Sequence, residues 1–145
     1  VLLAEGTNAH PRIAEAILNA LSWPRVDLAR RLSNSPPALQ ISLLTELDTR
    51  LLVIATNRAM GGSLRLLAID RLAEAESIHP QSEELAGLVE DAHSTREIRR
   101  AALVSLFSLN PEYAERRGIL GHFANDPIYR HSVERGLELR AWRQR

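Results

Sequence analysis

The chain has 145 residues, of which 4% are aromatic and none is cysteine, and its 18 basic residues balance 18 acidic ones to a formal net charge of zero. This balance provides no basic field to attract nucleic acid or an anionic membrane, and no segment approaches the ~20 apolar residues of a membrane-spanning helix. The lack of cysteine excludes disulfides, zinc–thiolate sites and thiol nucleophiles.

The composition favours an all-helical globular domain. Leucine, alanine, arginine and glutamate are abundant, whereas the β-branched and aromatic residues that favour sheets are scarce. We assign residues 1–145 to a single domain, a length that can bury a core of its own. Because the chain begins at Val1, we expect it to be part of a longer protein. The compartment stays open, with the cytoplasm favoured.

One helical pattern occurs five times. Its clearest copy runs from Ile98 to Leu106, with apolar or small residues at offsets 0, 3, 4 and 8, which lie on one face of a helix. A second apolar segment precedes each copy, so the predicted unit is a pair of helices joined by a turn. In chain order, the expected first helices cover 1–6, 24–32, 49–60, 82–92 and 111–124, and the expected second helices cover 13–21, 39–47, 64–72, 98–106 and 129–137.

Turn-forming residues separate the two helices of each pair. Asp126 before a proline predicts an N-cap with proline at the first helical position, and Ser94 with Glu97 predicts a capping box. We also expect helices to start at Ser82 and at Pro111. The expected turns cover 8–11, 34–37, 60–63, 92–95 and 124–127.

Stacking of the helix pairs follows from their amphipathic pattern. A single pair of this size cannot hide its apolar face, whereas pairs stacked side by side bury a continuous core. Small residues in the middle of each second helix, such as Ala102, allow a neighbouring helix to approach closely. We therefore expect an all-α fold, a right-handed α-α superhelix of about five two-helix repeats.

The turn-plus-helix segments resemble the HEAT repeat family, whose pattern has Asp-Pro in the turn and an apolar-Arg pair at the start of the second helix. The segment DPIYR at 126–130 matches this pattern, and 95–103 and 61–69 match it apart from the turn acid. The first two copies depart from it, because Ala14 and Gln40 replace the arginine. The resemblance covers nearly the whole chain and implies a HEAT-like solenoid.

The resemblance also implies a structural role for one column of arginines. Arg65, Arg99 and Arg130 occupy the family's arginine position in three successive repeats. By analogy with HEAT arrays, they are expected to reach the turn acid or the turn carbonyls of adjacent repeats, with Asp126 as the one turn acid present.

No catalytic or metal-binding motif stands out. None of the five histidines forms a His-x-x-x-His or His-Glu-x-x-His pair, the spacing that directs two ligands from one helical face. The chain has no Gly-x-Ser-x-Gly segment, and no Gly-Lys-Ser/Thr follows Gly61-Gly62. We expect no catalytic residue, no metal site and no cofactor.

The C-terminal segment combines four arginines with an aromatic residue. One interpretation is a basic and aromatic contact surface around Trp142. The other, which we prefer, is a polar cap on the array, with Trp142 packed on the last repeat or on a continuation of it. The arginines are Arg135, Arg140, Arg143 and Arg145.

The second helices supply the candidate binding residues. Their positions at offsets 2 and 6 point away from the apolar stripe, and in HEAT-like solenoids these helices usually line the concave surface. Apolar residues there, such as Leu66, could instead be buried by an adjacent repeat. The candidates on the expected concave face are Ile41, Leu66, Arg100, His131 and Arg135.

These patterns predict a non-enzymatic scaffold that binds a protein or peptide along its concave face. One alternative is a nucleic-acid-binding protein related to helical-repeat DNA glycosylases, although the neutral charge and few aromatics argue against nucleic acid as a partner. Another alternative is a helical-repeat enzyme of the lyase type. The sequence does not indicate an oligomeric state.

Overall fold

The computed structural model describes residues 30, 32–74, 79–123 and 126–144, and every regular element within them is a helix. The all-helical class is therefore confirmed for this part of the chain. The expected helices at 1–6 and 13–21, and nearly all of that at 24–32, lie outside it. The elements are the 3-10 helix η1 (Leu32–Asn34) and the α-helices α4 (Pro37–Thr56), α5 (Gly62–Leu72), α6 (His79–Glu90), α7 (Arg96–Leu109), α8 (Pro111–Arg116), α9 (Ile119–Phe123) and α10 (Pro127–Arg143).

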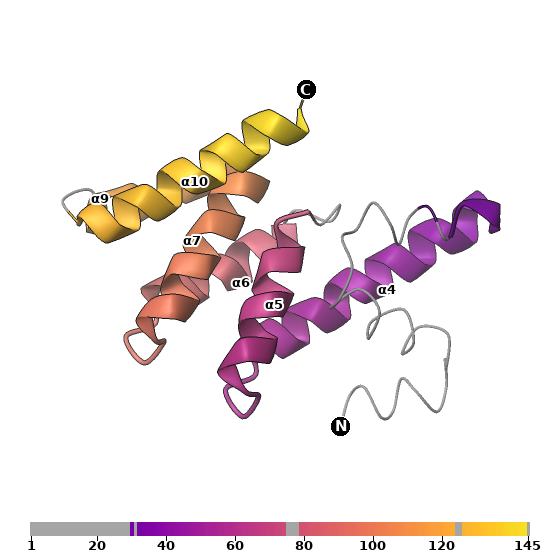
Figure 1. Ribbon diagram of the computed structural model, residues 1–145, viewed down its shortest axis with the longest axis horizontal. Coiled ribbons are helices and arrows are strands. Elements are labelled where there is room, and N and C mark those ends of the chain that lie inside the picture. The colour runs from indigo at the N-terminus through magenta and orange to yellow at the C-terminus, as the bar shows by residue number, and fades with distance from the viewer. Residues whose placement is uncertain (1–29, 31, 75–78, 124–125, 145) are drawn as a thin grey trace.

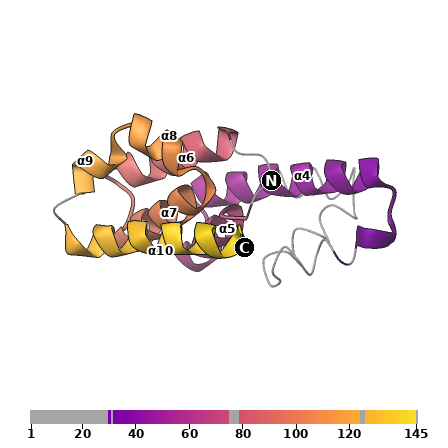
Figure 2. The same cartoon turned by 90° about the horizontal axis from the view of Figure 1, so that it is seen from above.

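The helices lie in two layers. In one layer α5, α7 and α10 are side by side, with α7 in the middle and in contact with both neighbours (Figure 1). In the other layer α4 packs against α5, and α6 packs against α7. The short helices α8 and α9, which follow α7 in the chain, extend this layer beyond α6 (Figure 2). The helices α5, α7 and α10 all begin on the same side of the molecule (Figure 1).

Two of the tight turns have the same structure at a spacing of 34 residues. In each, an Asn or Asp side chain accepts a hydrogen bond of 2.9 Å from the backbone N–H two residues later, Asn57 from Ala59 and Asp91 from His93. In each, the carbonyl of that residue also accepts a 3.1 Å bond from the N–H three residues later. The α4–α5 and α6–α7 pairs are therefore built around one repeated turn.

The two turns are tied to each other. The Arg58 guanidinium of the first turn donates a hydrogen bond to the Asp91 carboxylate of the second. The hydrogen bond from the His93 backbone holds the pKa of Asp91 below its ordinary value of 3.8, and the Arg58 charge acts in the same direction. A turn acid thus connects neighbouring helix pairs, but this acid is Asp91 and its partner lies outside the expected arginine column.

The helix starts follow the capping residues of the sequence, with one change. Asp126 caps α10 by accepting a 3.0 Å hydrogen bond from the Ile128 N–H, as predicted. Pro111 is the first residue of α8, as predicted, and Asn110 is its N-cap. The expected Ser94–Glu97 capping box is wrong. Thr95 caps α7 instead, one residue later, through a 3.2 Å bond to its hydroxyl from the N–H of the third helical residue.

Helix α4 is one continuous helix of 20 residues where the sequence predicts two, at 39–47 and 49–60. The predicted break is wrong because neither glycine nor proline lies near Asp48, and the buried stripe continues through Leu51 and Ile54. One long helix thus stands where two successive repeats were expected to meet. The pattern of five separate two-helix units is not reproduced in this region.

Two other boundaries differ from expectation. Helix α6 begins at His79, three residues before Ser82, which is completely buried inside the helix instead of capping it. The single helix expected at 111–124 is divided into α8 and α9, because Gly118 adopts a left-handed conformation with φ of 77°. Glycine accepts this conformation without the steric cost that a side chain would bring.

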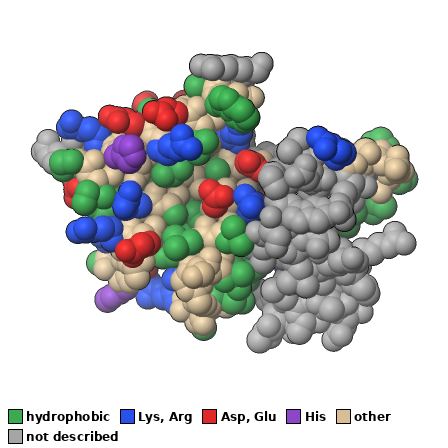
Figure 3. Space-filling model, viewed as in Figure 1, with side chains coloured by type: hydrophobic (Ala, Val, Ile, Leu, Met, Phe, Trp, Pro, Cys, Tyr) green, Lys and Arg blue, Asp and Glu red, His purple; other side chains and the backbone are tan. Residues whose placement is uncertain are grey.

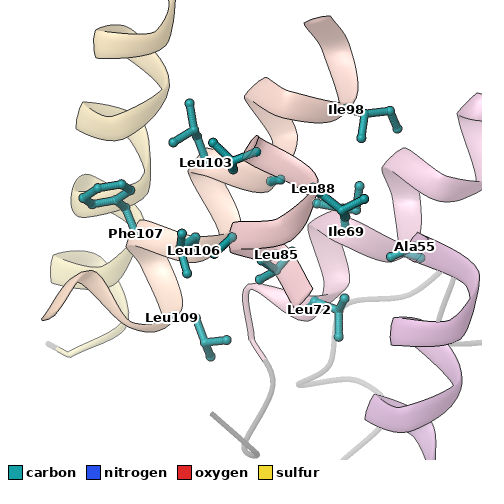
Figure 4. Close-up of a cluster of buried hydrophobic side chains, with 14 of the residues drawn as sticks. Ala55, Ile69, Leu72, Leu85, Leu88, Ile98, Leu103, Leu106, Phe107 and Leu109 are labelled. Carbon is teal, nitrogen blue, oxygen red and sulfur yellow. The ribbon is translucent and has the colours of Figure 1, made fainter. Parts of the chain in front are cut away.

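A continuous apolar core lies between the layers, and side chains from α5, α6 and α7 meet there (Figure 4). Ala68 and Ala102, small residues of the repeated pattern, are both 0% exposed. Between α5 and α7, the buried Ser105 hydroxyl donates a 2.6 Å hydrogen bond to the Ile69 carbonyl, which satisfies a polar group inside the core.

The buried register departs from the pattern in two copies. In α4, Leu39 and Ser42 are exposed, and Leu44 lies in the core instead. In α10, Leu137 is 42% exposed, and Gly136 before it is buried. The pattern therefore predicts the buried face of α5 and α7 correctly, but it misplaces part of the buried face of α4 and the last buried position of α10.

Gly136 sets the distance between α7 and α10. A Cβ atom at this position would lie 2.5 Å from the Val104 carbonyl oxygen and 2.9 Å from the Phe107 Cβ, far inside normal contact distances. Phe107 projects from α7 beside the α10 ribbon in Figure 4. Glycine therefore lets the two helices approach to backbone contact.

We expect Ala102→Asp to unfold the protein. A carboxylate at a fully buried position has no room and no partner, and it should lower the free energy of unfolding by roughly 4 kcal/mol or more. Chemical denaturation followed by circular dichroism measures this change. The control is Ala92→Asp in the exposed α6–α7 turn. Equal stability of the two variants would contradict the buried register of α7.

Alanine at Gly136 and at Gly87 should have opposite effects. Both glycines lie inside helices, but a Cβ at Gly87 meets no atom within 4 Å. Gly87→Ala should stabilise the protein by about 0.5–1 kcal/mol through helix propensity alone. Gly136→Ala should destabilise it by about 2 kcal/mol, because backbone atoms of α7 cannot move aside. Stabilisation by both would show that α10 does not approach α7 this closely.

The Asp91 carboxylate should make stability depend on pH. Because its pKa is lower in the folded protein, it stabilises the fold above its ordinary value of 3.8, and this contribution disappears as the pH falls through the folded pKa. Asp91→Asn keeps a side-chain oxygen for the turn but loses the charge. Urea denaturation between about pH 6 and about pH 2 should show a stability gap between wild type and variant that closes at the acid end.

An exposed acid provides the control for that experiment. Asp70 lies on the surface of α5, where its carboxylate contacts the adjacent Arg71 at 3.2 Å. Asp70→Asn should leave a smaller gap, because surface ion pairs contribute little. A gap for Asp91→Asn that stays constant down to the lowest pH would contradict the role of the Arg58–Asp91 contact.

Candidate functional site

The clearest surface hollow lies between α7 and α10. It has a volume of about 350 Å³ and is open to solvent. Side chains spaced three or four residues apart on each helix line it, as the helical repeat requires when one face borders a groove. They are Glu97, Arg100, Ala101 and Val104 from α7, and His131, Ser132 and Arg135 from α10.

The hollow has a mixed floor and a charged rim. The buried Ser132 and the half-buried Ala101 and Val104 form its base, while Arg100, His131 and Arg135 are exposed around it. The close approach of the helices at Gly136 joins the two walls just below, so the depression is shallow. The visible face of the described residues carries charges of both signs interspersed with apolar side chains (Figure 3).

Three of the five predicted binding residues meet at this hollow. Arg100 of α7 meets His131 and Arg135 of α10, which follow it by 31 and 35 positions in the sequence. Ile41 does not join them, since it is 62% exposed on α4. Leu66 on α5 is half-buried and packs against the core, as the alternative reading of its position allowed.

Glu97, which the sequence suggested for a capping box, is a further lining residue. It lies three residues before Arg100 on α7, so the helical spacing places the two on one face. The rim therefore presents two guanidinium groups and a histidine against one carboxylate. A ligand with negative charge and an apolar side chain would match both the rim and the floor.

A second hollow continues along the outer face of α10. It has a volume of about 530 Å³ and shares Arg135 with the first hollow. Trp142 forms its far end and is 71% exposed. It therefore does not pack on the last repeat, and the other form of that expectation, packing on a continuation of the array, stays a prediction. Between Arg135 and Trp142 the second hollow is lined by Glu138, Leu139 and Ala141.

The other two described arginines of this segment face inward. Arg140 donates to the carbonyls of Ser108 and Leu109 at 3.2 and 2.9 Å. Arg143 donates to the Ser108 carbonyl and hydroxyl, both at 2.6 Å, and to the Ala73 carbonyl. Burial of the guanidinium lowers the pKa of Arg143 from its ordinary value. These arginines satisfy carbonyls at the C-terminal ends of α5 and α7, where the helix dipole favours positive charge.

The arginine column is structural, but it acts within a helix pair. Arg65 on α5 donates from Nε to the Ala55 carbonyl of α4, at 3.0 Å in a buried position. Arg99 on α7 donates to the Asp91 carbonyl at the end of α6, at 3.1 and 2.8 Å. Only the Asp91 carbonyl lies in a turn, since Ala55 belongs to the last turn of α4. Both contacts link the two helices of one pair and not adjacent repeats. Arg130 occupies the same position of α10, four residues after its N-cap.

The described residues hold no group of three or more His, Cys, Asp or Glu side chains placed to bind a metal ion. No helix among them is long and apolar enough to cross a membrane. His10, and the side chains of His79 and His122, lie outside the description.

Comparison of the chain with protein-family models, curated proteins and solved structures gives no match. The HEAT resemblance therefore stays a prediction carried by the sequence pattern. The functional argument rests on the geometry of the two hollows and on the charges around them.

Proposed function

We propose that the chain is a HEAT-like right-handed α-α superhelix that acts as a non-enzymatic scaffold and binds a protein or peptide. The layer of α5, α7 and α10 is its concave, ligand-binding face. The observation that supports this proposal most is the meeting of Arg100, His131 and Arg135 around the half-buried Ala101 and Val104 on that layer.

The repeated local structure supports the architectural part of the proposal. The turns at Asn57 and Asp91 share their hydrogen bonds at a 34-residue spacing. Each of the following helices carries an arginine that donates to the end of the preceding helix. A scaffold assembled from such units offers a long surface without a deep cavity, which suits a peptide better than a small molecule.

The chemistry of the hollow specifies the kind of protein segment. Arg100 and Arg135 have exposed guanidinium groups that can each donate two parallel hydrogen bonds to a carboxylate. The half-buried Ala101 and Val104 can cover one small apolar side chain. The proposed partner is therefore an acidic peptide segment with apolar residues.

We expect the Arg100→Glu, Arg135→Glu double variant to bind acidic peptides at least tenfold more weakly while remaining folded. Both side chains are exposed, and the substitutions convert attraction into repulsion at the rim. Peptides selected from a random 12-residue library on the wild-type protein would be titrated against both proteins by fluorescence anisotropy. Circular dichroism and thermal unfolding would confirm that the double variant folds.

A second double variant, Arg96→Glu with Arg116→Glu, provides the matched control. It changes the net charge by the same amount at two exposed positions that do not line the hollow. Equal weakening by both double variants, or no enrichment of any peptide, would contradict the proposed function. Salt-sensitive retention of a single-stranded or duplex oligonucleotide in place of peptides would favour the nucleic-acid alternative.

A further inference from the structure

The two hollows form one strip because a single residue lines both. Arg135 borders the α7–α10 hollow on one side and the outer hollow of α10 on the other. From there, residues 138, 139 and 142 follow at helical spacings that keep them on one face of α10. The strip runs from Arg100 to Trp142 and changes along its length from charged to apolar.

Only part of the positive charge in this region is directed to solvent. Arg140 and Arg143 are occupied with carbonyls of α5 and α7, as described above. Arg100 and Arg135 remain exposed at the charged end of the strip. Arg135 has an acidic neighbour, since its guanidinium lies 3.4 Å from the Glu138 carboxylate.

That ion pair is weak enough to be exchanged. Its two side chains are 57% and 68% exposed, and pairs of this kind contribute little in water. An incoming carboxylate would compete with Glu138 for Arg135. Glu138 therefore opposes an acidic ligand at the middle of the strip.

The apolar end of the strip is unusual for a protein surface. Trp142 is 71% exposed beside the half-buried Leu139. Exposed tryptophans with one free face are typical anchors of binding surfaces. Trp142 follows Arg135 by seven positions, which corresponds to about 10 Å along a helix. An extended peptide covers that distance with about three residues.

From this geometry we infer that the strip binds an extended peptide segment in two parts. One or two acidic residues pair with Arg100 and Arg135, and a large apolar or aromatic residue about three positions away packs on Leu139 and Trp142. This inference rests on the proposed function and adds to it the composition and spacing of the partner. It also assigns Glu138 as a residue that limits affinity.

Synthetic peptides test the inference directly. The two-part probe is a fluorescein-labelled 12-residue peptide of Gly and Ser that contains Glu-Glu and, three positions later, Phe. One control probe replaces Glu-Glu by Gln-Gln, and a second replaces Phe by Ala. Fluorescence anisotropy gives the Kd of each probe for the full chain and its variants.

The expected effects have opposite signs. Arg135→Gln and Trp142→Ala should each weaken binding of the two-part probe by about tenfold, whereas Glu138→Gln should tighten it by about threefold. Arg135→Gln should not affect the Gln-Gln probe, and Trp142→Ala should not affect the Ala probe. Glu134→Gln and Leu137→Ala are matched controls on exposed positions of α10 that line neither hollow.

A spectroscopic signal reports contact with the aromatic end. The chain has two tryptophans, so Trp23→Phe leaves Trp142 as the sole indole. Its emission should shift to shorter wavelength when the two-part probe binds and should not shift with the Ala probe.

The outcomes separate the inference from the proposed function. If library-selected peptides bind but Arg135→Gln, Trp142→Ala and Glu138→Gln leave every Kd unchanged, the two-part strip is wrong. The scaffold proposal then stands if the Arg100→Glu, Arg135→Glu double variant still weakens binding of those peptides. Failure of the two-part probe to bind more tightly than both control probes also overturns the inference. If neither the library nor the designed probes yield a binder, both proposals fall.

Discussion

The structure depends on how closely its neighbouring second helices approach one another. Between α7 and α10 the distance is set by Gly136, whose missing side chain brings two backbones into contact. Between α5 and α7 the approach is marked by the buried hydrogen bond from Ser105 to Ile69. Larger side chains at such positions would separate the helices and expose the apolar core that both layers share. The alignment of α5, α7 and α10 follows from these contacts, and so does the surface that they present.

Polar contacts at the two ends of the layer reinforce this arrangement. At the edge where α5 and α7 begin, Arg58 joins the turn of one helix pair to Asp91 of the next. At the opposite ends of these helices, Arg140 and Arg143 bind carbonyls that would otherwise lack partners. Because these two arginines bind carbonyls, the exposed guanidinium groups beside the α7–α10 hollow are those of Arg100 and Arg135. The same helix, α10, thus closes the core with one face and offers the candidate binding strip with another.

Much of the fold was predictable because its signals are local. The caps at Asp126 and Asn110, the helical composition and the amphipathic spacing of 98–106 all depend on residues within one or two turns of chain. The errors arose where local signals are silent. Near Asp48 no glycine or proline marks a break, but the expected repeat pattern called for two helices where α4 is one. The buried face of α10 could not be read from Leu137, because its register depends on the fit of Gly136 against α7, which lies about thirty residues away.

The positions of the candidate residues were predictable to the extent that helical geometry alone sets them, as for Arg100 and Arg135, which line one hollow. The contacts of Arg143 depend on the ends of two other helices, and no local sequence pattern predicts them.

Nuclear Overhauser measurements on the isotopically labelled chain test the central claim most directly. The account predicts contacts between Gly136 and Phe107 and between Ile69 and Ser105, with none between Ile54 of α4 and Val133 of α10. Absence of the first two contacts would show that the second helices do not approach one another as described, and presence of the third would show helices gathered around a shared centre. Either result would contradict the account.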